Sequence, residues 1–252
     1  MKRIFLVGTP RSGTTLLQSL LASHPEVISF PESKFFHYLL YNKFVKKFPD
    51  RLSAFFKDEI NRPELLRNFD NSQSTELKVS WFVGVLDSLA AEDQKSIWLE
   101  KTPEHIYFIQ DIERFLPDVK FIHILRNGMD TIASLYEATR IPSELWGDGW
   151  DLKHCIERWK QAVLISHKYV KNSHHRLVKY EELVDNKTKL LAELCNFMGV
   201  EYDSKMLDYQ VNAAKLSLNA PWHKGIERDI QSTKFHKYHG IFKSHEIQYI
   251  LE

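Results

Sequence analysis

The sequence predicts an α/β fold of the P-loop type, in which a parallel sheet is flanked by helices on both faces. Short apolar runs alternate with segments of helical periodicity along the chain, and this alternation is typical of a parallel sheet covered by helices. The first apolar run is followed by a glycine-rich turn and a helix, the order in which a phosphate-binding loop is built. No repeat, low-complexity tract or linker divides the sequence. We therefore expect a single domain, residues 1–252, with a helical insertion at about 33–95.

The chain begins with a predicted strand, a loop and a helix. The apolar run from Ile4 to Val7 is typical of a buried parallel strand, and turn-forming residues follow it at positions 8–13. Four leucines between positions 16 and 21 recur at helical spacing. Proline disfavours a helical conformation of the residue before it, so His24-Pro25 should end this helix. Val27 to Phe30 is the second predicted strand.

Residues 33–95 are predicted to be mostly helical, with breaks at Pro49 and Pro63. Eight aromatic residues lie between positions 35 and 56. They favour a helical subdomain that packs its own core. Some of them, together with the stretch 141–150, are also candidates for the wall of a binding pocket.

The alternation returns after position 95. Ser96 to Leu99 is a predicted strand, and Thr102-Pro103-Glu104 predicts a helix start with threonine as the N-cap and proline at the first helical position. The clearest strand of the chain is Val119 to Leu125. The remaining expected elements are a helix around Ile132 to Tyr136, an amphipathic helix at 151–172, a strand from Arg176 to Tyr180 and a helix that Gly199 ends.

The composition indicates a soluble globular protein and excludes several other classes. Lys and Arg number 34 and Asp and Glu 33, giving a net charge of +1, which excludes a generally basic nucleic-acid binder. Cys155 and Cys195 form neither a CxxC motif nor a disulfide framework, which favours a reducing compartment. The apolar run after Lys2-Arg3 is too short for a signal peptide, and no run reaches the roughly 18 residues of a membrane helix. We therefore expect a cytoplasmic protein with no membrane span and no nucleic-acid partner, of undetermined oligomeric state.

The first chemical motif is Gly8-Thr9-Pro10-Arg11-Ser12-Gly13-Thr14-Thr15. It matches the phosphate-loop pattern G-x-x-x-x-G-K-[ST] at every fixed position except the lysine, which is threonine here. The missing lysine, and Arg126 at the strand end where nucleotide hydrolases carry an aspartate, favour a transfer assisted by cations of the protein instead of magnesium. Glu100, at the end of the predicted strand 96–99, could take the place of that aspartate. A small-molecule kinase that uses ATP and magnesium is therefore the alternative.

Three motifs together resemble the sulfotransferase family. Pro10 to Leu16 is similar to its 5′-phosphosulfate loop, Leu125 to Asp130 to its 3′-phosphate motif, and Lys179 to Val184 to its third landmark. The arginine in the first motif, followed by Ser23-His24-Pro25-Glu26-Val27, resembles the protein-tyrosine sulfotransferase branch and its bacterial relatives more than the small-molecule cytosolic branch. The motifs occur in the family's order.

The resemblance implies a PAPS-dependent sulfotransferase, where PAPS is the donor 3′-phosphoadenosine 5′-phosphosulfate. It would move a sulfuryl group in line to a hydroxyl or amine of a small-molecule or peptide acceptor. The residues implied to bind the donor are Arg11, Ser12, Gly13, Thr14 and Thr15 in the loop, Arg126 and Ser134 at the 3′-phosphate, Tyr180 near the adenine, and more weakly Lys224 in His223-Lys224-Gly225 and Arg140. The histidine clusters His174-His175 and His236-x-x-His239 lack the ligand spacing of a zinc site, so we expect no metal.

Two cations are candidates for a catalytic role. Negative charge grows on the leaving phosphate during transfer, and fixed cations aimed at it lower the barrier. Arg11 lies in the loop and can form paired hydrogen bonds with the phosphosulfate. Lys101, at a predicted strand end, resembles the lysine that neighbours the leaving group in the tyrosine-sulfating branch.

An acceptor hydroxyl also needs a base that removes its proton. Glu32 is the candidate, because it lies 21 residues after Arg11 (32 − 11) and matches the catalytic glutamate of the tyrosine-sulfating branch. That branch has two consecutive acidic residues, and the first of them is Pro31 here. His37 and His105 are the alternative bases.

Overall fold

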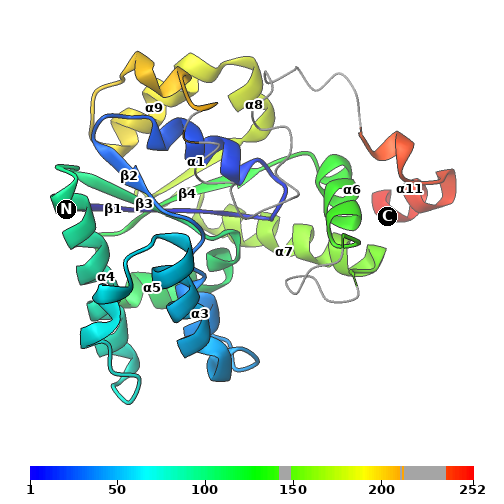
Figure 1. Ribbon diagram of the computed structural model, residues 1–252. Coiled ribbons are helices and arrows are strands. Elements are labelled where there is room, and N and C mark those ends of the chain that lie inside the picture. The colour runs from blue at the N-terminus through cyan, green and yellow to red at the C-terminus, as the bar shows by residue number, and fades with distance from the viewer. Residues whose placement is uncertain (142–148, 211, 213–236) are drawn as a thin grey trace.

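The computed structural model describes residues 1–141, 149–210, 212 and 237–252. Within these ranges, five parallel strands form one sheet in the order β2-β3-β1-β4-β5. Helices cover both faces of this sheet (Figure 1). The α/β fold that the alternation of strands and helices predicts is therefore confirmed.

The first strand lies in the middle of the sheet. The strands are β1 (Lys2–Gly8), β2 (Val27–Ser29), β3 (Ile97–Lys101), β4 (Lys120–Leu125) and β5 (His175–Lys179). Leu6 pairs with Lys101, and Gly8 pairs with Ile124, so the carboxyl ends of β1, β3 and β4 meet at one edge. In open parallel sheets, ligands bind beyond this edge, next to the point where the strand order reverses.

The helices form one layer on each face of the sheet and a third group at its end (Figure 1). One layer consists of α1 (Thr14–Ala22), α8 (Tyr180–Asp185) and α9 (Lys187–Met198). The other consists of α2 (Phe35–Leu40), α3 (Phe48–Ala54), α4 (Thr75–Glu92), α5 (Ile109–Phe115) and α7 (Leu152–Tyr169). Beside the carboxyl edge lie α6 (Gly128–Ala138) and α11 (Ser244–Leu251).

Short 3-10 and π segments connect these elements. They are η1 (Val45–Lys47), η2 (Phe55–Glu59), η3 (Pro63–Asn68), η4 (Pro103–Phe108), η5 (Ser204–Leu207) and η7 (Lys237–Gly240). Pro49 lies in the first turn of α3 and Pro63 begins η3, so both prolines open helical elements where the sequence suggested breaks. Proline fits the first turn because the N–H that it lacks has no partner there.

The side chains of β1 alternate between two hydrophobic cores. Ile4 and Leu6 pack with α1 and α9, whereas Phe5 and Val7 pack with the helices of the opposite layer, and all four are fully buried. Burial on both faces explains why this strand is an unbroken apolar run. The aromatic residues of 33–95 join the second core as predicted; Phe35, for example, stacks on Phe82 with ring centroids 4.0 Å apart.

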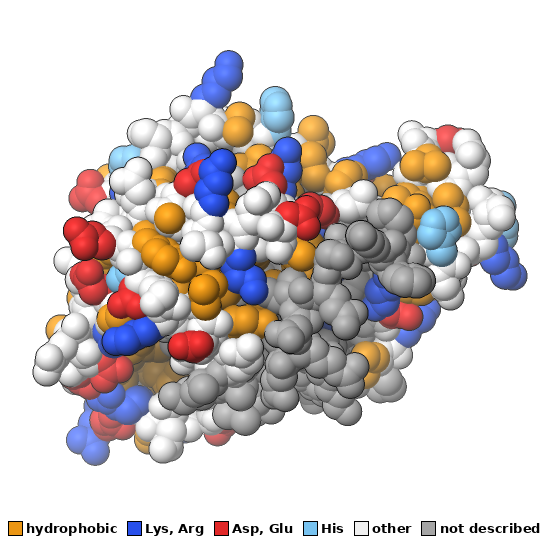
Figure 2. Space-filling view, turned by 90° about the horizontal axis from the view of Figure 1, so that it is seen from above, with side chains coloured by type: hydrophobic (Ala, Val, Ile, Leu, Met, Phe, Trp, Pro, Cys, Tyr) orange, Lys and Arg blue, Asp and Glu red, His pale blue; other side chains and the backbone are white. Residues whose placement is uncertain are grey.

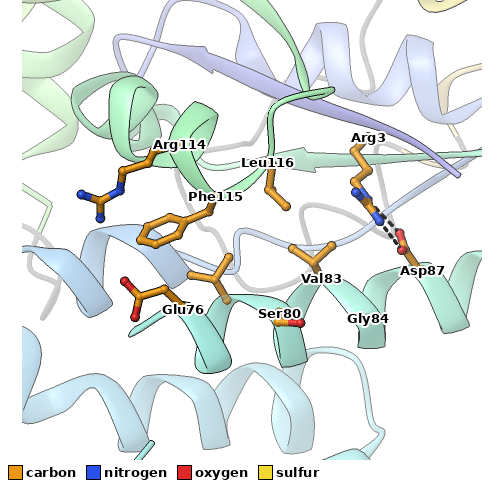
Figure 3. Close-up of a pocket in the computed structure, with 10 residues that line it drawn as sticks. Arg3, Glu76, Ser80, Val83, Gly84, Asp87, Arg114, Phe115 and Leu116 are labelled. Carbon is orange, nitrogen blue, oxygen red and sulfur yellow. Dashed lines mark hydrogen bonds and ion pairs between the residues drawn. The ribbon is translucent and has the colours of Figure 1, made fainter. Parts of the chain in front are cut away.

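A pocket of about 550 Å³ lies between α4, the end of α5 and the start of β1 (Figure 3). Arg3 pairs with Asp87 at its wall, with 2.7 Å between Nη2 and Oδ2. Arg3 is five residues before Gly8, which corresponds to roughly 17 Å of strand. The pocket therefore lies at the opposite end of β1 from the glycine-rich loop.

The surface agrees with the balanced composition. Acidic and basic side chains are interspersed on the face that Figure 2 shows, instead of gathering by sign. None of the described helices combines the length and the apolar character that crossing a bilayer requires. Cys155 and Cys195 are free thiols in the core, and burial raises their pKa values to about 12 and about 11.

Candidate functional site

The loop between β1 and α1 depends on two glycines for close packing. A Cβ atom on Gly8 would lie 2.5 Å from the Ile124 carbonyl oxygen. Gly13 has φ 95°, and a Cβ atom there would lie 2.4 Å from Cδ2 of Tyr180. Arg11 also has a positive φ of 74°, so the loop makes a sharp turn into the first turn of α1.

Several polar groups in and beside the loop are buried without a partner among the described residues. Thr9 Oγ1 and Ser12 Oγ are buried and have no hydrogen-bond partner within the described ranges, and the same holds for Nε of Arg126. Leaving such a group unpaired costs about 1–3 kcal/mol, and native proteins keep few of them. Thr14 and Thr15 begin α1 and are also buried. Buried hydroxyl and guanidinium donors beside a helix start fit a bound anion.

Four of the predicted donor-binding residues lie together at the ends of β1, β4 and β5. Nε of Arg11 donates to Oγ of Ser134 at 3.2 Å, and the guanidinium of Arg126 lies over the Tyr180 ring, 4.6 Å from its centroid. Burial lowers the pKa of Arg11, and the charge of Arg126 lowers it further. Two cations near enough to influence each other, and both half-buried, attract an anion more strongly than they would in water.

The carboxylate and the lysine proposed for catalysis form an ion pair at the other side of the loop. Nζ of Lys101 lies 2.6 Å from Oε1 of Glu32 and 3.5 Å from Oγ1 of Thr15. Lys101 is 3% exposed and Glu32 29% exposed. Nζ of Lys34 lies 4.0 Å from the second carboxylate oxygen, Oε2 of Glu32. Lys101 therefore joins the phosphate loop to the candidate base.

Glu100 is committed to contacts within the protein. It is 1% exposed and accepts hydrogen bonds from Ser33, Thr102 and His105. Burial raises its pKa, but His105 and these hydrogen bonds outweigh burial and hold the pKa below its ordinary value. A carboxylate with both oxygens bound inside the core is poorly suited to hold magnesium, so the kinase alternative is not favoured.

Thr102 occupies the N-cap position before Pro103, as predicted, and the helix that follows is the 3-10 helix η4. The side chain of Thr102 makes no capping bond, because its hydroxyl donates to Glu100 at 2.7 Å and accepts from the Lys34 amide at 3.1 Å. His105 is fully buried with both ring nitrogens bonded. This leaves His105 no ring nitrogen for an acceptor proton.

The other candidates lie outside this cluster or outside the described ranges. Burial lowers the pKa of His37 to about 4. Arg140 folds back on its own helix, where its guanidinium lies 3.2 Å from the centroid of the Tyr136 ring and donates to the Tyr136 and Trp150 carbonyls. Lys224 lies outside the described residues, as does most of 141–150. In the parts of the chain that are described, no three His, Cys, Asp or Glu side chains are grouped to hold a metal ion.

Residues without a motif also contribute to this region. Arg51, from α3, donates through Nε to the Ser33 carbonyl at 3.0 Å and through Nη2 to the Glu32 carbonyl. The guanidinium of Arg158 lies 4.3 Å from the centroid of the Tyr107 ring. No local pattern marks these arginines, because each acts on a segment distant in sequence.

Comparison with known proteins identifies relatives across most of the chain. The model of the sulfotransferase family matches residues 3–204. A protein-tyrosine sulfotransferase of Drosophila melanogaster is 23% identical over 83% of this chain. The chain spans 40% of the length of that relative.

Solved structures share the fold. The sulfotransferase domain of the Synechococcus PCC 7002 olefin synthase has a TM-score of 0.65 and 20% identity, covering 100% of this chain and 94% of that one. A mouse sulfotransferase solved in complex with PAP (3′-phosphoadenosine 5′-phosphate) has a TM-score of 0.58 and 15% identity, covering 98% of this chain and 81% of that one.

Proposed function

The chain belongs to the sulfotransferase family, and from this premise we propose that it transfers a sulfuryl group from PAPS to an acceptor. The observation that carries the proposal is the convergence of Arg11, Ser134 and Arg126 at the loop, opposite the ion pair of Glu32 with Lys101. One side of this arrangement suits a polyanionic nucleotide, and the other suits removal of a proton from an acceptor.

We propose that the loop and the two arginines hold the donor. The backbone of residues 9–13, the start of α1 and Arg11 would bind the 5′ side, whereas Arg126 and Ser134 would bind the 3′-phosphate. Tyr180, which lies against both Gly13 and Arg126, would pack near the adenine. The hydroxyls of Thr9 and Ser12 and Nε of Arg126 support this assignment, because they are buried donors without a partner in the described chain.

The chemistry requires a base at the acceptor and cations at the leaving group. The bound donor supplies the sulfuryl group and a phosphate leaving group. Glu32 is partly exposed, so an acceptor hydroxyl or amine can reach its carboxylate and lose a proton to it. Lys101 contacts both Glu32 and the loop, where its charge offsets the negative charge that develops. Arg11 acts in the same way from the loop.

The acceptor is a small molecule or a peptide. The tyrosine-sulfating relative supports a peptide, whereas Pro31, in place of the first of two consecutive acidic residues, is a difference from that branch.

We also propose a single sulfotransferase-like domain with 33–95 as a helical insertion, because the helices of this segment share one core with β1. A cytoplasmic location and a reaction without metal stay predictions.

The proposal is tested with purified protein, radiolabelled PAPS, and three acceptors: 4-nitrophenol, a tyrosine-containing peptide and a simple sugar. We expect PAP to bind and at least one acceptor to be labelled. Glu32→Gln should abolish most labelling and leave the Kd for PAP unchanged, and Glu26→Gln, before β2 at its opposite end, should behave like the wild type. Stabilisation by ATP with magnesium, but not by PAP, would contradict the proposed function.

A further inference from the structure

We propose that Glu100 positions Glu32 for catalysis by holding the backbone that follows it, residues 33–36. The inference rests on the proposed function, because it takes Glu32 as the base. Glu100 does not touch the reacting groups, so its role is that of a positioning residue. It precedes Lys101 at the end of β3, and consecutive strand residues point to opposite faces of the sheet. One residue can therefore hold the backbone while the next pairs with the Glu32 side chain.

Two backbone amides reach the first carboxylate oxygen of Glu100. The N–H of Ser33 donates to Oε1 directly, at 3.2 Å. The N–H of Lys34 donates to the Thr102 hydroxyl at 3.1 Å, and that hydroxyl donates to Oε1 at 2.7 Å. The first amide is thus bound to the carboxylate, and the second is bound through one side chain.

The next two amides reach Glu100 in the same indirect way. The N–H of Phe35 donates to the Ser33 hydroxyl at 3.2 Å, and that hydroxyl donates to Oε1 at 2.6 Å. The N–H of Phe36 donates to Nε2 of His105 at 3.3 Å. A ring nitrogen that accepts carries no proton, so the proton of His105 is on Nδ1, which donates to Oε2 of Glu100 at 2.9 Å. Four consecutive amides therefore depend on one carboxylate.

Three of these amides, those of Lys34, Phe35 and Phe36, need partners outside the helix. They open α2, and the first N–H groups of a helix have no acceptor within it. The segment is also strained, because Lys34 has a φ of 54°, in the left-handed region, which persists only where the surroundings enforce it. Hydrogen bonds to a charged group are stronger than those between neutral groups. The hydrogen bonds to the Glu100 carboxylate therefore stabilise the left-handed backbone at Lys34.

Glu32 is fixed from three directions as a result. Its side chain pairs with Lys101, and its carbonyl accepts from Arg51. The chain that continues from it is bound to Glu100 through residues 33–36. A displacement of about 1 Å at a reacting group can cost about 10²-fold in rate. Loss of the hydrogen bonds between Glu100 and residues 33–36 should therefore lower turnover.

Glu100→Gln tests the proposal with almost no change in volume. A glutamine offers one oxygen. If that oxygen faces Ser33, the amide nitrogen meets the Nδ1–H of His105, and if it faces His105, the nitrogen meets the Ser33 N–H. In either orientation one fixed donor loses its acceptor. Asp87→Asn is the matched control, since Asp87 also binds two donors, Arg3 and Trp98, but at the far end of β1 (Figure 3).

Exchange and NMR measurements on the PAP-bound protein, together with turnover of PAPS and titration of the free protein with PAP, decide the outcome. In Glu100→Gln we expect amide hydrogen exchange of residues 33–36 to accelerate about tenfold or more, equal to 1.4 kcal/mol, the Glu32 Cδ signal to shift in carbon-13 spectra, and kcat for the labelled acceptor to fall with the Kd for PAP unchanged. Nitrogen-15 spectra of the wild type should show His105 protonated at Nδ1. Asp87→Asn should leave all of these unchanged.

Unchanged exchange and an unchanged Glu32 signal in Glu100→Gln would overturn the proposal, as would an equal fall of kcat in Asp87→Asn. The two NMR measurements need no acceptor, so they test the tie between Glu100 and Glu32 by themselves. A wild-type protein that labels no acceptor would count against the proposed function instead, which keeps the two failures distinguishable.

Discussion

Gly13 is a position in the phosphate loop where a side chain would be strained in two ways. Its φ of 95° is in the left-handed half of the Ramachandran plot, where alanine costs about 1–2 kcal/mol. The added Cβ would lie 2.4 and 2.8 Å from two carbons of the Tyr180 ring, and overpacking of this kind typically costs about 1–3 kcal/mol. We therefore expect Gly13→Ala to lower the free energy of unfolding by about 2–5 kcal/mol.

The same substitution should weaken donor binding. The Tyr180 ring lies against both Gly13 and the guanidinium of Arg126, so a shift of the ring displaces a proposed 3′-phosphate ligand. We expect the Kd for PAP to rise about tenfold or more, equal to 1.4 kcal/mol. Urea denaturation measures the stability, and isothermal titration calorimetry measures the binding.

Gly84 provides the matched control. It lies within α4, and a Cβ atom there would meet no heavy atom within 4 Å. Glycine inside a helix is less favourable than alanine by about 0.5–1 kcal/mol, so Gly84→Ala should raise the free energy of unfolding by that amount and leave PAP binding unchanged. The reasoning is refuted if Gly13→Ala is as stable as the wild type, or if the two variants change stability in the same direction.

Two further predictions concern buried charge. Burial lowers the pKa of His123 to about 3 and also lowers the pKa of His175. The His175 ring is hydrogen-bonded to His123 through Nδ1 and to Glu113 through Nε2. The unfolded chain therefore binds protons that the folded chain does not, so the free energy of unfolding should fall as pH falls from 6.5 toward 3; urea denaturation at pH 7.5 and pH 5 measures this, and an unchanged pH dependence in His123→Gln would contradict it. Arg126→Gln should raise the Kd for PAP about tenfold to a hundredfold, as loss of a charged hydrogen bond implies, whereas Arg176→Gln, on the exposed side of β5, should not; equal effects in calorimetry would contradict the role of Arg126.

The elements that sequence patterns predict well are those whose signals are local. The apolar run at β1 and the leucines of α1 are found in the structure where the periodicity placed them, and Gly199 ends α9 in the left-handed conformation that a C-cap requires. Buried strands and amphipathic helices leave these patterns because their own side chains must meet the core. The strand predicted to include Tyr180 ends at Lys179, since Tyr180 begins α8.

The sequence did not reveal the partners of two side chains near the end of β3. Thr102 is the N-cap residue of η4, but its hydroxyl binds the Glu100 carboxylate and the Lys34 amide instead of capping the helix. Glu100 resembled an acidic strand end that could hold magnesium, yet its oxygens are used within the core. A buried carboxylate takes the strongest donors that surround it, and the sequence does not say which these are.

The charge balance, the order of strands and helices, and the glycine-rich loop with its missing lysine are determined by the sequence itself. They follow from composition and from spacings of a few residues. Only the tertiary structure decided that Lys101 meets Glu32, 69 positions away, that Arg11 reaches Ser134 across 123 positions, and that Glu100 binds the segment 33–36. Parallel strands bring such residues to one edge of the sheet through long connections, and contacts made across those connections leave no periodic trace in the chain.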